Sequence, residues 1–267
     1  ATMPAGTVFT SSVGDESYQF VTIQSVTALL QGSSIPFDNV IIYEGSYVSS
    51  RYTVDVQNVE QRFLINDDRV DTTTLTVTVQ NSLSDSTLTT YTLATDIAGL
   101  TSTSNVYFLQ EVEDGKYEIY FGDGILGSLV EDGNIVIMNY VVTNKGAANS
   151  AAVFTSSSAI DTVNSVNVRL VSPAAGGAEP ESIESIKYNA PLDYASQGRC
   201  VTTEDYKTYV RQLFANTQSV SVWGGEDGSF SNVTGASDIA EYGKIFISVK
   251  SITGLNLNET QKAQLLH

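Results

Sequence analysis

The chain has 267 residues with 30 acidic and 13 basic side chains, which gives a formal net charge of −17. Proteins that bind nucleic acid or anionic membranes gather Lys and Arg on one surface. Here the basic residues are few and scattered, so we expect no nucleic acid and no membrane as partner. The sequence contains no run of about 18 apolar residues, which a membrane-spanning helix would need, so no membrane span is predicted. At this length and 42% hydrophobic content, the chain can bury the core of one large or two ordinary domains.

Cysteine and histidine are nearly absent, since the chain holds only Cys200 and the last residue, His267. A single cysteine cannot form a disulfide within the chain. Zinc sites and nucleophilic centres that use histidine lack their usual groups. We therefore predict that the chain is not an enzyme and has no catalytic, cofactor-binding or metal-binding residues.

Residues 7 to 155 have the texture of strands and turns. Apolar and polar side chains alternate over 74–79, 52–56, 117–121 and 134–142, which is typical of half-buried strands. The pairs Asp114-Gly115, Asp123-Gly124 and Asp132-Gly133 separate such runs and predict tight hairpin turns. This part is expected to be antiparallel β structure.

The acidic turns and one glycine-rich turn are candidate binding sites. Carboxylates on turns suit Ca²⁺, but their spacing does not match the regular twelve-residue calcium loop, and a glycosidase pair would need an aromatic-lined cleft. Phe121-Gly-Asp-Gly-Ile-Leu-Gly127 lacks the Gly-Lys-Ser/Thr ending of a phosphate-binding loop. Solvated turns account better for all of them. The six acidic residues are Glu111, Glu113, Asp114, Asp123, Glu131 and Asp132.

The texture changes through residues 156–177. A small-residue stretch around 146–159 is interpreted as a connection, a strand is predicted over 163–171, and Pro173 with Gly176 and Gly177 marks a break. Pro180 and nearby acidic residues then predict a helix start, with Ile183 and Ile186 on one face. Pro191 is expected to end that helix.

A second helix is predicted from Thr202, whose hydroxyl can cap it with Asp205 three residues on. Its apolar positions recur at helical spacing, typical of a core-facing stripe: Tyr206, Tyr209, Val210, Leu213 and Phe214. Strands are predicted over 219–223 and 244–250. A last helix is predicted from Asn258, with Gln261 completing a capping box.

Both ends suggest a piece of a longer polypeptide, because Leu265 and Leu266 begin an apolar face without continuation. We expect the module with the last two helices to dock against a second copy. The candidate interface residues are Leu265, Leu266, Tyr206, Tyr209 and Leu213.

The fold class is therefore mixed α+β. An antiparallel β-rich part over 1–155, as one domain or two sub-domains, is followed by a connection with one strand over 156–177. A small α+β module over 178–267 is truncated at its C-terminal helix.

Two blocks of turns and strands follow one another along the chain. The first runs from Asp114 through Asp132-Gly-Asn to Gly146-Ala-Ala-Asn, and the second from Gly176 to Tyr206. Together they resemble the baseplate J-like family of contractile phage tails, in which Ala is common at the position of Cys200. The Ser/Thr-rich region before residue 105 looks closest to the baseplate wedge protein of T-even phages. The motif residues are Phe121, Gly122, Asp123, Gly124, Gly127, Gly176, Gly177, Glu181, Ser182, Thr202, Asp205 and Tyr206.

The resemblance implies a structural protein of the virion tail baseplate, assembled in the host cytoplasm. Such proteins form the inner ring around the central hub and contact other baseplate wedge proteins. On host contact the ring rearranges and releases sheath contraction. No catalytic residues are implied. The alternative from the residues is a receptor- or carbohydrate-binding β module of a tail fibre or adhesin.

Overall fold

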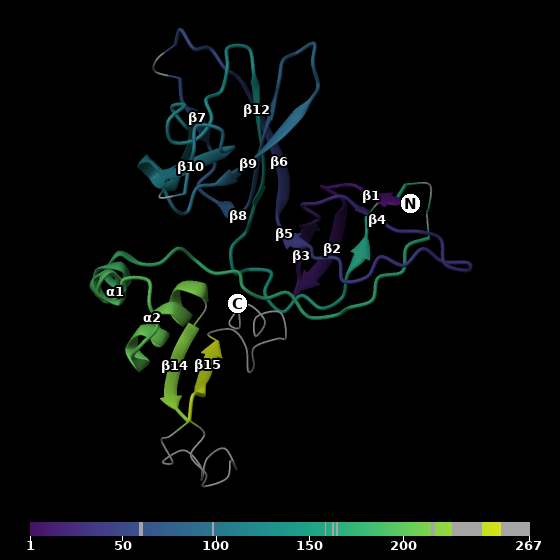
Figure 1. Cartoon of the computed structure of the whole chain (residues 1–267). Helices are drawn as coiled ribbons and strands as arrows, with labels where there is room; N and C mark the ends of the chain where they lie inside the picture. The colour runs from purple at the N-terminus through teal and green to yellow at the C-terminus, as the bar shows by residue number, and fades with distance from the viewer. Residues whose placement is uncertain are drawn as a thin grey trace. The chain divides into compact units, whose positions relative to one another are not determined.

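A computed structural model describes residues 1–58, 61–97, 99–157, 159–161, 163, 165–214, 217–225 and 242–251. The mixed α+β class expected from the sequence is confirmed, because the regular structure of the described residues is mainly strands, with two α-helices towards the C-terminus (Figure 1). The chain divides into two compact units, residues 1–144 with 154–169 and residues 145–153 with 170–267. The domain boundaries predicted from composition stay a prediction.

The larger sheet of the first unit has the strand order β6-β12-β8-β9-β10-β11-β7. Alternation predicted β8, β11 and β12 correctly, but of the run expected over 52–56 only 52 and 53 are strand, at the end of β6. In β8, Leu75, Val77 and Val79 are buried, while the threonines between them face away from the core. The strands are β6 (Ser46–Thr53), β12 (Ile135–Val142), β8 (Val70–Gln80), β9 (Leu88–Leu93), β10 (Val106–Glu111), β11 (Tyr117–Phe121) and β7 (Phe63–Ile65).

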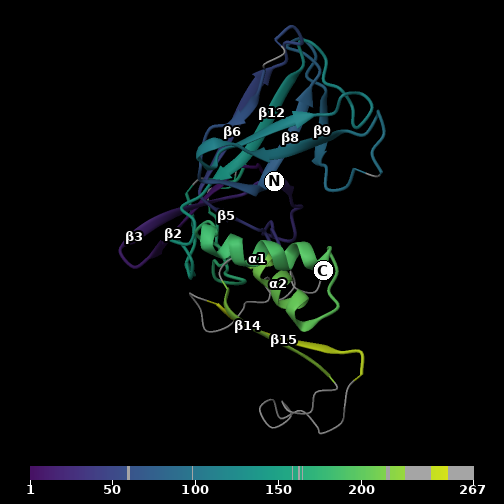
Figure 2. The ribbon, with the colours of Figure 1, turned by 90° about the vertical axis from the view of Figure 1, so that its left-hand side faces the viewer.

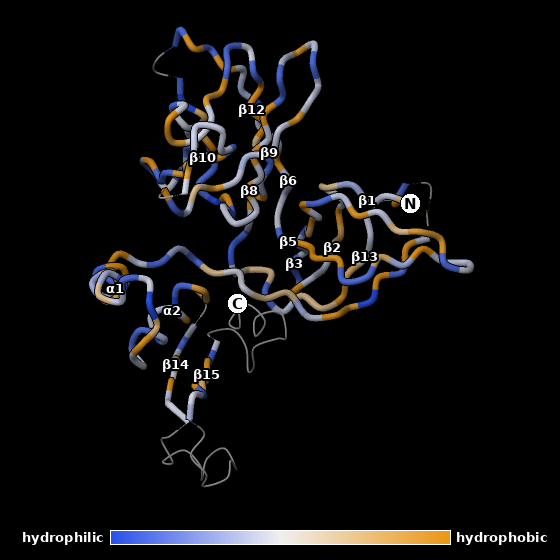
Figure 3. The backbone as a smooth tube through the Cα atoms, in the orientation of Figure 1, coloured by the Kyte–Doolittle hydropathy of each residue, from blue (hydrophilic) through white to orange (hydrophobic). Residues whose placement is uncertain are grey.

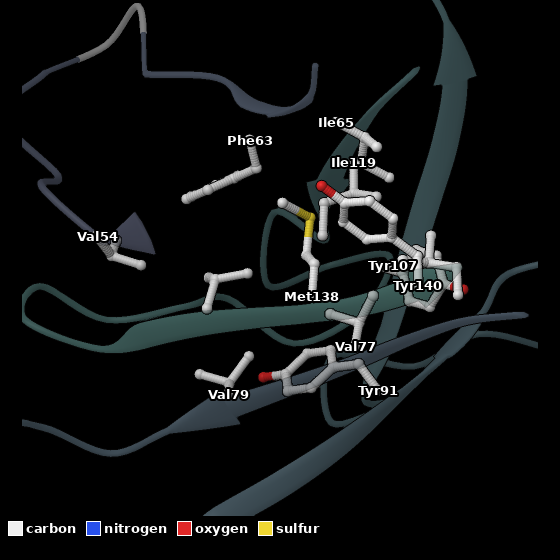
Figure 4. Packing of buried hydrophobic residues seen from close by; sticks show 12 residues of the cluster. Val54, Phe63, Ile65, Val77, Val79, Tyr91, Tyr107, Ile119, Met138 and Tyr140 are labelled. Carbon is white, nitrogen blue, oxygen red and sulfur yellow. The ribbon is translucent and has the colours of Figure 1, made fainter. Parts of the chain in front are cut away.

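This sheet encloses the main hydrophobic core, in which Met138, Val77 and Val136 are wholly buried (Figure 4). One side chain links the two end strands of this sheet, because the Tyr52 hydroxyl on β6 donates a 2.8 Å hydrogen bond to the Leu64 carbonyl on β7. Edge-to-face ring contacts at 5.2–5.8 Å continue this contact across the core. The contacting pairs are Tyr52–Phe63, Phe63–Phe121 and Tyr91–Phe121.

The sequence suggested a wholly antiparallel sheet, but one strand pair of this sheet is parallel. β9 and β10 pair in parallel, with Val106 opposite Thr92. Of the three Asp-Gly pairs, one closes a hairpin: Asp114 (φ 61°) and Gly115 (φ 68°), in the short 3₁₀ turn η1 (Glu113–Gly115), join β10 to β11. The other two lie in the connection from β11 to β12, which are not paired with each other, so the hairpin prediction is wrong there.

The smaller sheet of the first unit has the order β13-β2-β3-β5, and β1 pairs with β4 beside it. Phe20 is 2% exposed, and its ring meets that of Phe154 edge to face at 4.9 Å. The strands are β13 (Thr155–Ser156), β2 (Val8–Val13), β3 (Glu16–Val21), β5 (Tyr43–Glu44), β1 (Thr2–Met3) and β4 (Val26–Thr27).

Gly45 is the single residue between β5 and β6, and therefore between the two sheets. Its φ of +124° is rare for L side chains, and a Cβ there would lie 2.2 Å from the Val142 carbonyl oxygen. Its N–H donates a 2.8 Å bond to the Gln19 carbonyl. Only glycine fits this crossing.

The strand predicted over 163–171 does not form in the described residues. Val163 makes an isolated bridge with Ile160, and 165–171 have no regular structure. Val171 is 79% exposed, so the apolar residues of this stretch find no sheet to join. Alternation alone does not supply a pairing partner.

The second unit contains α1 (Ile183–Ser196), α2 (Thr203–Leu213), β14 (Thr217–Gly224) and β15 (Ile245–Ser251). Helix α2 and the antiparallel β14–β15 ribbon confirm the predicted elements (Figure 2). A small core of Val210, Phe214 and Val220 joins α2 to β14. The predicted stop at Pro191 is wrong, because α1 continues through it. Proline inside a helix removes one backbone donor but does not force an end when the flanking turns hold. No helix among the described residues is long and apolar enough to cross a membrane.

Candidate functional site

The middle of the first motif block, between β11 and β12, forms a loop of residues 122–134 that we call the glycine loop. The Asp123 carboxylate accepts hydrogen bonds from the N–H groups of Leu126 and Ile125, both at 2.9 Å, and these bonds hold the pKa of Asp123 below its ordinary value. A Cβ on Gly122 would lie 2.4 Å from the Leu126 carbonyl oxygen, so the loop needs glycine there. The motif thus fixes a backbone shape.

The glycine loop carries three exposed apolar side chains. Ile125 is 74% exposed, Leu129 60% and Leu126 42%. The backbone of the glycine loop is hydrogen-bonded to the connection between β9 and β10. Gly127 N–H donates to the Thr101 carbonyl (3.1 Å) and Ser128 N–H to the Ser104 carbonyl (2.8 Å). Several apolar groups on a fixed backbone are typical of an interaction surface.

The end of the first block meets the start of the second within the second unit. The Asn149 amide donates to the Gly177 carbonyl (2.7 Å) and accepts from the Gly177 N–H (3.2 Å). A Cβ on Gly177 would lie 2.2 Å from the Lys145 carbonyl oxygen. Gly176 beside it has φ +98°, which also favours glycine. The sequence placed these two blocks in order but did not predict their contact.

The acidic motif of the second block organises the start of α1. Ser182 is the N-cap, and its hydroxyl accepts the Ser185 N–H at 3.3 Å. The Glu181 carboxylate accepts from the Ser185 hydroxyl (2.5 Å) and from the Asn189 amide (2.8 Å), which together lower the pKa of Glu181. These residues are positioned for structure rather than for chemistry.

Thr202 and Asp205 cap α2 reciprocally, as the sequence predicted. The Thr202 hydroxyl accepts the Asp205 N–H at 3.2 Å, and the Asp205 carboxylate accepts the Thr202 N–H at 2.8 Å. Of the candidate interface residues, Tyr206 and Tyr209 are half-buried and Leu213 is 55% exposed. Leu265 and Leu266 lie outside the described residues, as does the predicted last helix.

One face of helix α1 carries apolar side chains that are exposed. Successive residues turn by 100°, so positions 183, 186, 190 and 194 share one face and 185, 189, 192 and 196 share nearly the opposite one. The first face, which we call the α1 stripe, is exposed: Ile183 70%, Ile186 46% and Tyr194 85%. The less exposed face holds Ser185, Asn189, Leu192 and Ser196.

The spacing of Ile183 and Ile186 predicts that they share a face of the helix but not which way that face points. Polar Ser185, Asn189 and Ser196 on the other side would normally predict that the apolar face is buried, so the sequence carries no signal for its exposure. Hydropathy drawn along the chain shows hydrophobic and hydrophilic residues mixed over α1 (Figure 3). A domain helix normally buries its apolar stripe, whereas the large side chains of the α1 stripe are exposed.

Among the described residues, no group of three or more His, Cys, Asp or Glu side chains is placed to hold a metal ion. Cys200 is half-buried, and burial together with the nearby Asp205 carboxylate raises the pKa of its thiol. A raised pKa disfavours the reactive thiolate. The arrangement offers two exposed apolar surfaces on rigidly braced backbones, which is the character of a structural assembly protein.

Comparison with known proteins agrees with that class. Residues 50–155 match the family model described as "Bacteriophage baseplate wedge protein gp6, third domain", and residues 202–267 match "Baseplate structural protein gp6, C-terminal domain I". The "Baseplate wedge protein gp6" of Enterobacteria phage T4 is 25% identical over 292 aligned positions, which cover 99% of this chain. The chain spans 41% of that relative's length.

These matches support a baseplate wedge-like structural protein of the virion, located in the tail baseplate. The resemblance to T-even wedge proteins is thereby confirmed in this coarse form, while the baseplate J-like family stays a prediction. The second match begins at Thr202, the N-cap of α2, so α1 lies between the two matched segments. Neither match concerns receptors or carbohydrates, and that alternative also stays a prediction.

Proposed function

We propose that this chain is a non-enzymatic building block of the baseplate wedge. It forms part of the inner ring around the central hub, binds a second copy of itself and other wedge proteins, and rearranges on host contact to release sheath contraction. Its similarity to T4 gp6 supports the wedge assignment. The relative is more than twice as long, so the activity and partners of the whole protein belong to this proposal.

The observation that carries self-association is the α1 stripe. Three large side chains on it are between 46% and 85% exposed, and burying each against a partner contributes roughly 1–3 kcal/mol. The stripe is flanked by both charge signs, since Glu184 and Lys187 form an ion pair at 3.5 Å on neighbouring positions. A surface with both signs can face a copy of itself across a two-fold axis without net repulsion.

Sedimentation of the purified chain over a concentration series tests this proposal. We expect a reversible dimer or larger species for the wild type. The double variant Ile183→Ser/Ile186→Ser should raise the dissociation constant at least about tenfold. Its matched control is Val153→Ser/Val171→Ser, which changes two β-branched residues of the same unit, outside α1, that are 76% and 79% exposed.

Two results would count against the proposal. A strictly monomeric wild type at high concentration would remove self-association by this chain. Equal weakening by the two double variants would show a general effect of lost hydrophobicity rather than docking at the stripe. Far-UV circular dichroism of both variants checks that each keeps the wild-type fold.

A further inference from the structure

We infer that the glycine loop, residues 122–134, is a second docking surface, distinct from the α1 stripe. It inserts Ile125, Leu126 and Leu129 into an apolar socket whose rim carries Lys and Arg, on a baseplate protein other than this chain. The inference rests on the proposed function, because the partner is sought among the components of the same baseplate. It adds to that function a specific surface and the chemistry of what it meets.

The apolar groups of the loop are presented rather than packed. Ile125, Leu126 and Leu129 are between 42% and 74% exposed, while Gly122 and Gly127 beneath them are buried. Leu129 lies over Gly124, because a Cβ added to Gly124 would lie 3.0 Å from Leu129 Cδ1. The glycines thus let the backbone close tightly while the larger side chains stay outside.

The backbone of the loop is already fixed before any partner binds. Gly124 N–H donates to the Gly127 carbonyl (3.0 Å), and the Asp123 carboxylate holds two further N–H groups. The Ser128 hydroxyl donates to the Asn105 side-chain oxygen (2.9 Å) and lies within hydrogen-bond distance of the Tyr91 hydroxyl (3.2 Å). A surface held in this way loses little conformational entropy on binding, which favours affinity.

The charge of the loop identifies the partner. The 13 residues from 122 to 134 contain three exposed carboxylates, Asp123, Glu131 and Asp132, and neither Lys nor Arg. A second copy would bring the same three negative charges to this surface and no positive ones, so like charges would oppose pairing here. A rim of Lys and Arg complements the loop, and the apolar tip fits a socket within that rim.

The test measures binding of the chain to the other baseplate proteins of the same phage, each purified and assayed singly by biolayer interferometry. The variants Leu126→Ser and Glu131→Lys change the apolar tip and the charged rim. Their matched controls are Leu83→Ser, at an 88% exposed leucine outside the loop, and Glu16→Lys, at an exposed glutamate of β3. For the component that meets the loop, each loop variant should raise the Kd at least about tenfold and each control less than about threefold.

Salt separates the charged rim from the apolar tip. Raising ionic strength from about 0.05 M to about 0.5 M should weaken wild-type binding and reduce the difference between Glu131→Lys and wild type. Wild-type binding that neither loop variant weakens would overturn this inference and leave the proposed function standing. Failure of the wild type to bind any baseplate component would overturn both. Loss of self-association in the loop variants would assign the loop to a second copy and overturn the inference.

Discussion

Glu44 and Asn144 lie 100 residues apart in the sequence and are joined by two hydrogen bonds. The Asn144 backbone N–H donates to Glu44 Oε2 at 2.8 Å, and its side-chain amide donates to Oε1 at 2.7 Å. The Thr143 hydroxyl adds a third bond to Oε2 at 2.7 Å. Glu44 ends β5 of the smaller sheet, and Thr143 follows β12, so one carboxylate ties the two sheets of the first unit together.

Removing this carboxylate by Glu44→Ala should lower the free energy of unfolding of the first unit by about 1–3 kcal/mol. Hydrogen bonds to a charged acceptor are worth more than neutral ones, and the Asn144 and Thr143 donors would lose their partner. Urea unfolding followed by far-UV circular dichroism measures the change. The control Glu16→Ala removes an exposed carboxylate from β3 and should change stability by less than about 0.5 kcal/mol. Equal stability of Glu44→Ala and wild type would contradict a structural role for these bonds.

Local signals predicted the elements whose determinants are close in sequence. Three such elements depend on residues that are close together in sequence. They are the cap formed by Thr202 and Asp205, the apolar stripe ending at Phe214, and the individual strands of the β14–β15 ribbon. The Asp114-Gly115 hairpin has the same character, because two residues of positive φ are enough to close it.

Long-range pairing could not be predicted in this way. Nothing in the alternation of Val106 and its neighbours says that β10 lies parallel to β9, or that β12 sits between β6 and β8. Period-two patterns give the face of a strand but not its neighbour. The contact between Asn149 and Gly177 was missed for the same reason, since it joins two segments 28 residues apart through backbone shape.

The crossing at Gly45 provides a sharper test of the junction between the sheets. Gly45→Ala should destabilise the first unit by about 3–5 kcal/mol, because its φ of +124° is strained for alanine and the new methyl would lie 2.2 Å from the Val142 carbonyl oxygen. Thermal unfolding by calorimetry should show a large drop in Tm or no folded first unit.

Gly14→Ala is the matched control for that change. Gly14 lies in the turn between β2 and β3 with φ +61°, and a Cβ there meets nothing within 4 Å. It should therefore cost only the backbone strain, about 1–2 kcal/mol. If both variants lost stability equally, the close approach of Gly45 to Val142 would have no part in the fold.

The cap of α2 makes the second unit sensitive to acid. Hydrogen bonds from the N–H groups of Thr202 and Val201 hold the pKa of Asp205 below its ordinary value of 3.8. A depressed pKa in the folded state means that the stabilisation is present above the unfolded pKa and is lost as pH falls through the folded pKa. The relevant window therefore lies below about pH 4.

Asp205→Asn should lower the Tm of the second unit at pH 7, and the difference from wild type should shrink as the pH falls below about 4. The variant lacks the charged acceptor at every pH, whereas the wild type loses it only on protonation. Trp223, the chain's only tryptophan, lies on β14 in the same unit as α2, so its fluorescence reports this transition. The control Glu204→Gln alters a carboxylate of the same helical turn, which pairs with Lys207, and leaves the cap intact. It should keep the pH dependence of the wild type. A constant difference between wild type and Asp205→Asn from pH 7 to pH 3 would show that the Asp205 charge does not stabilise the cap.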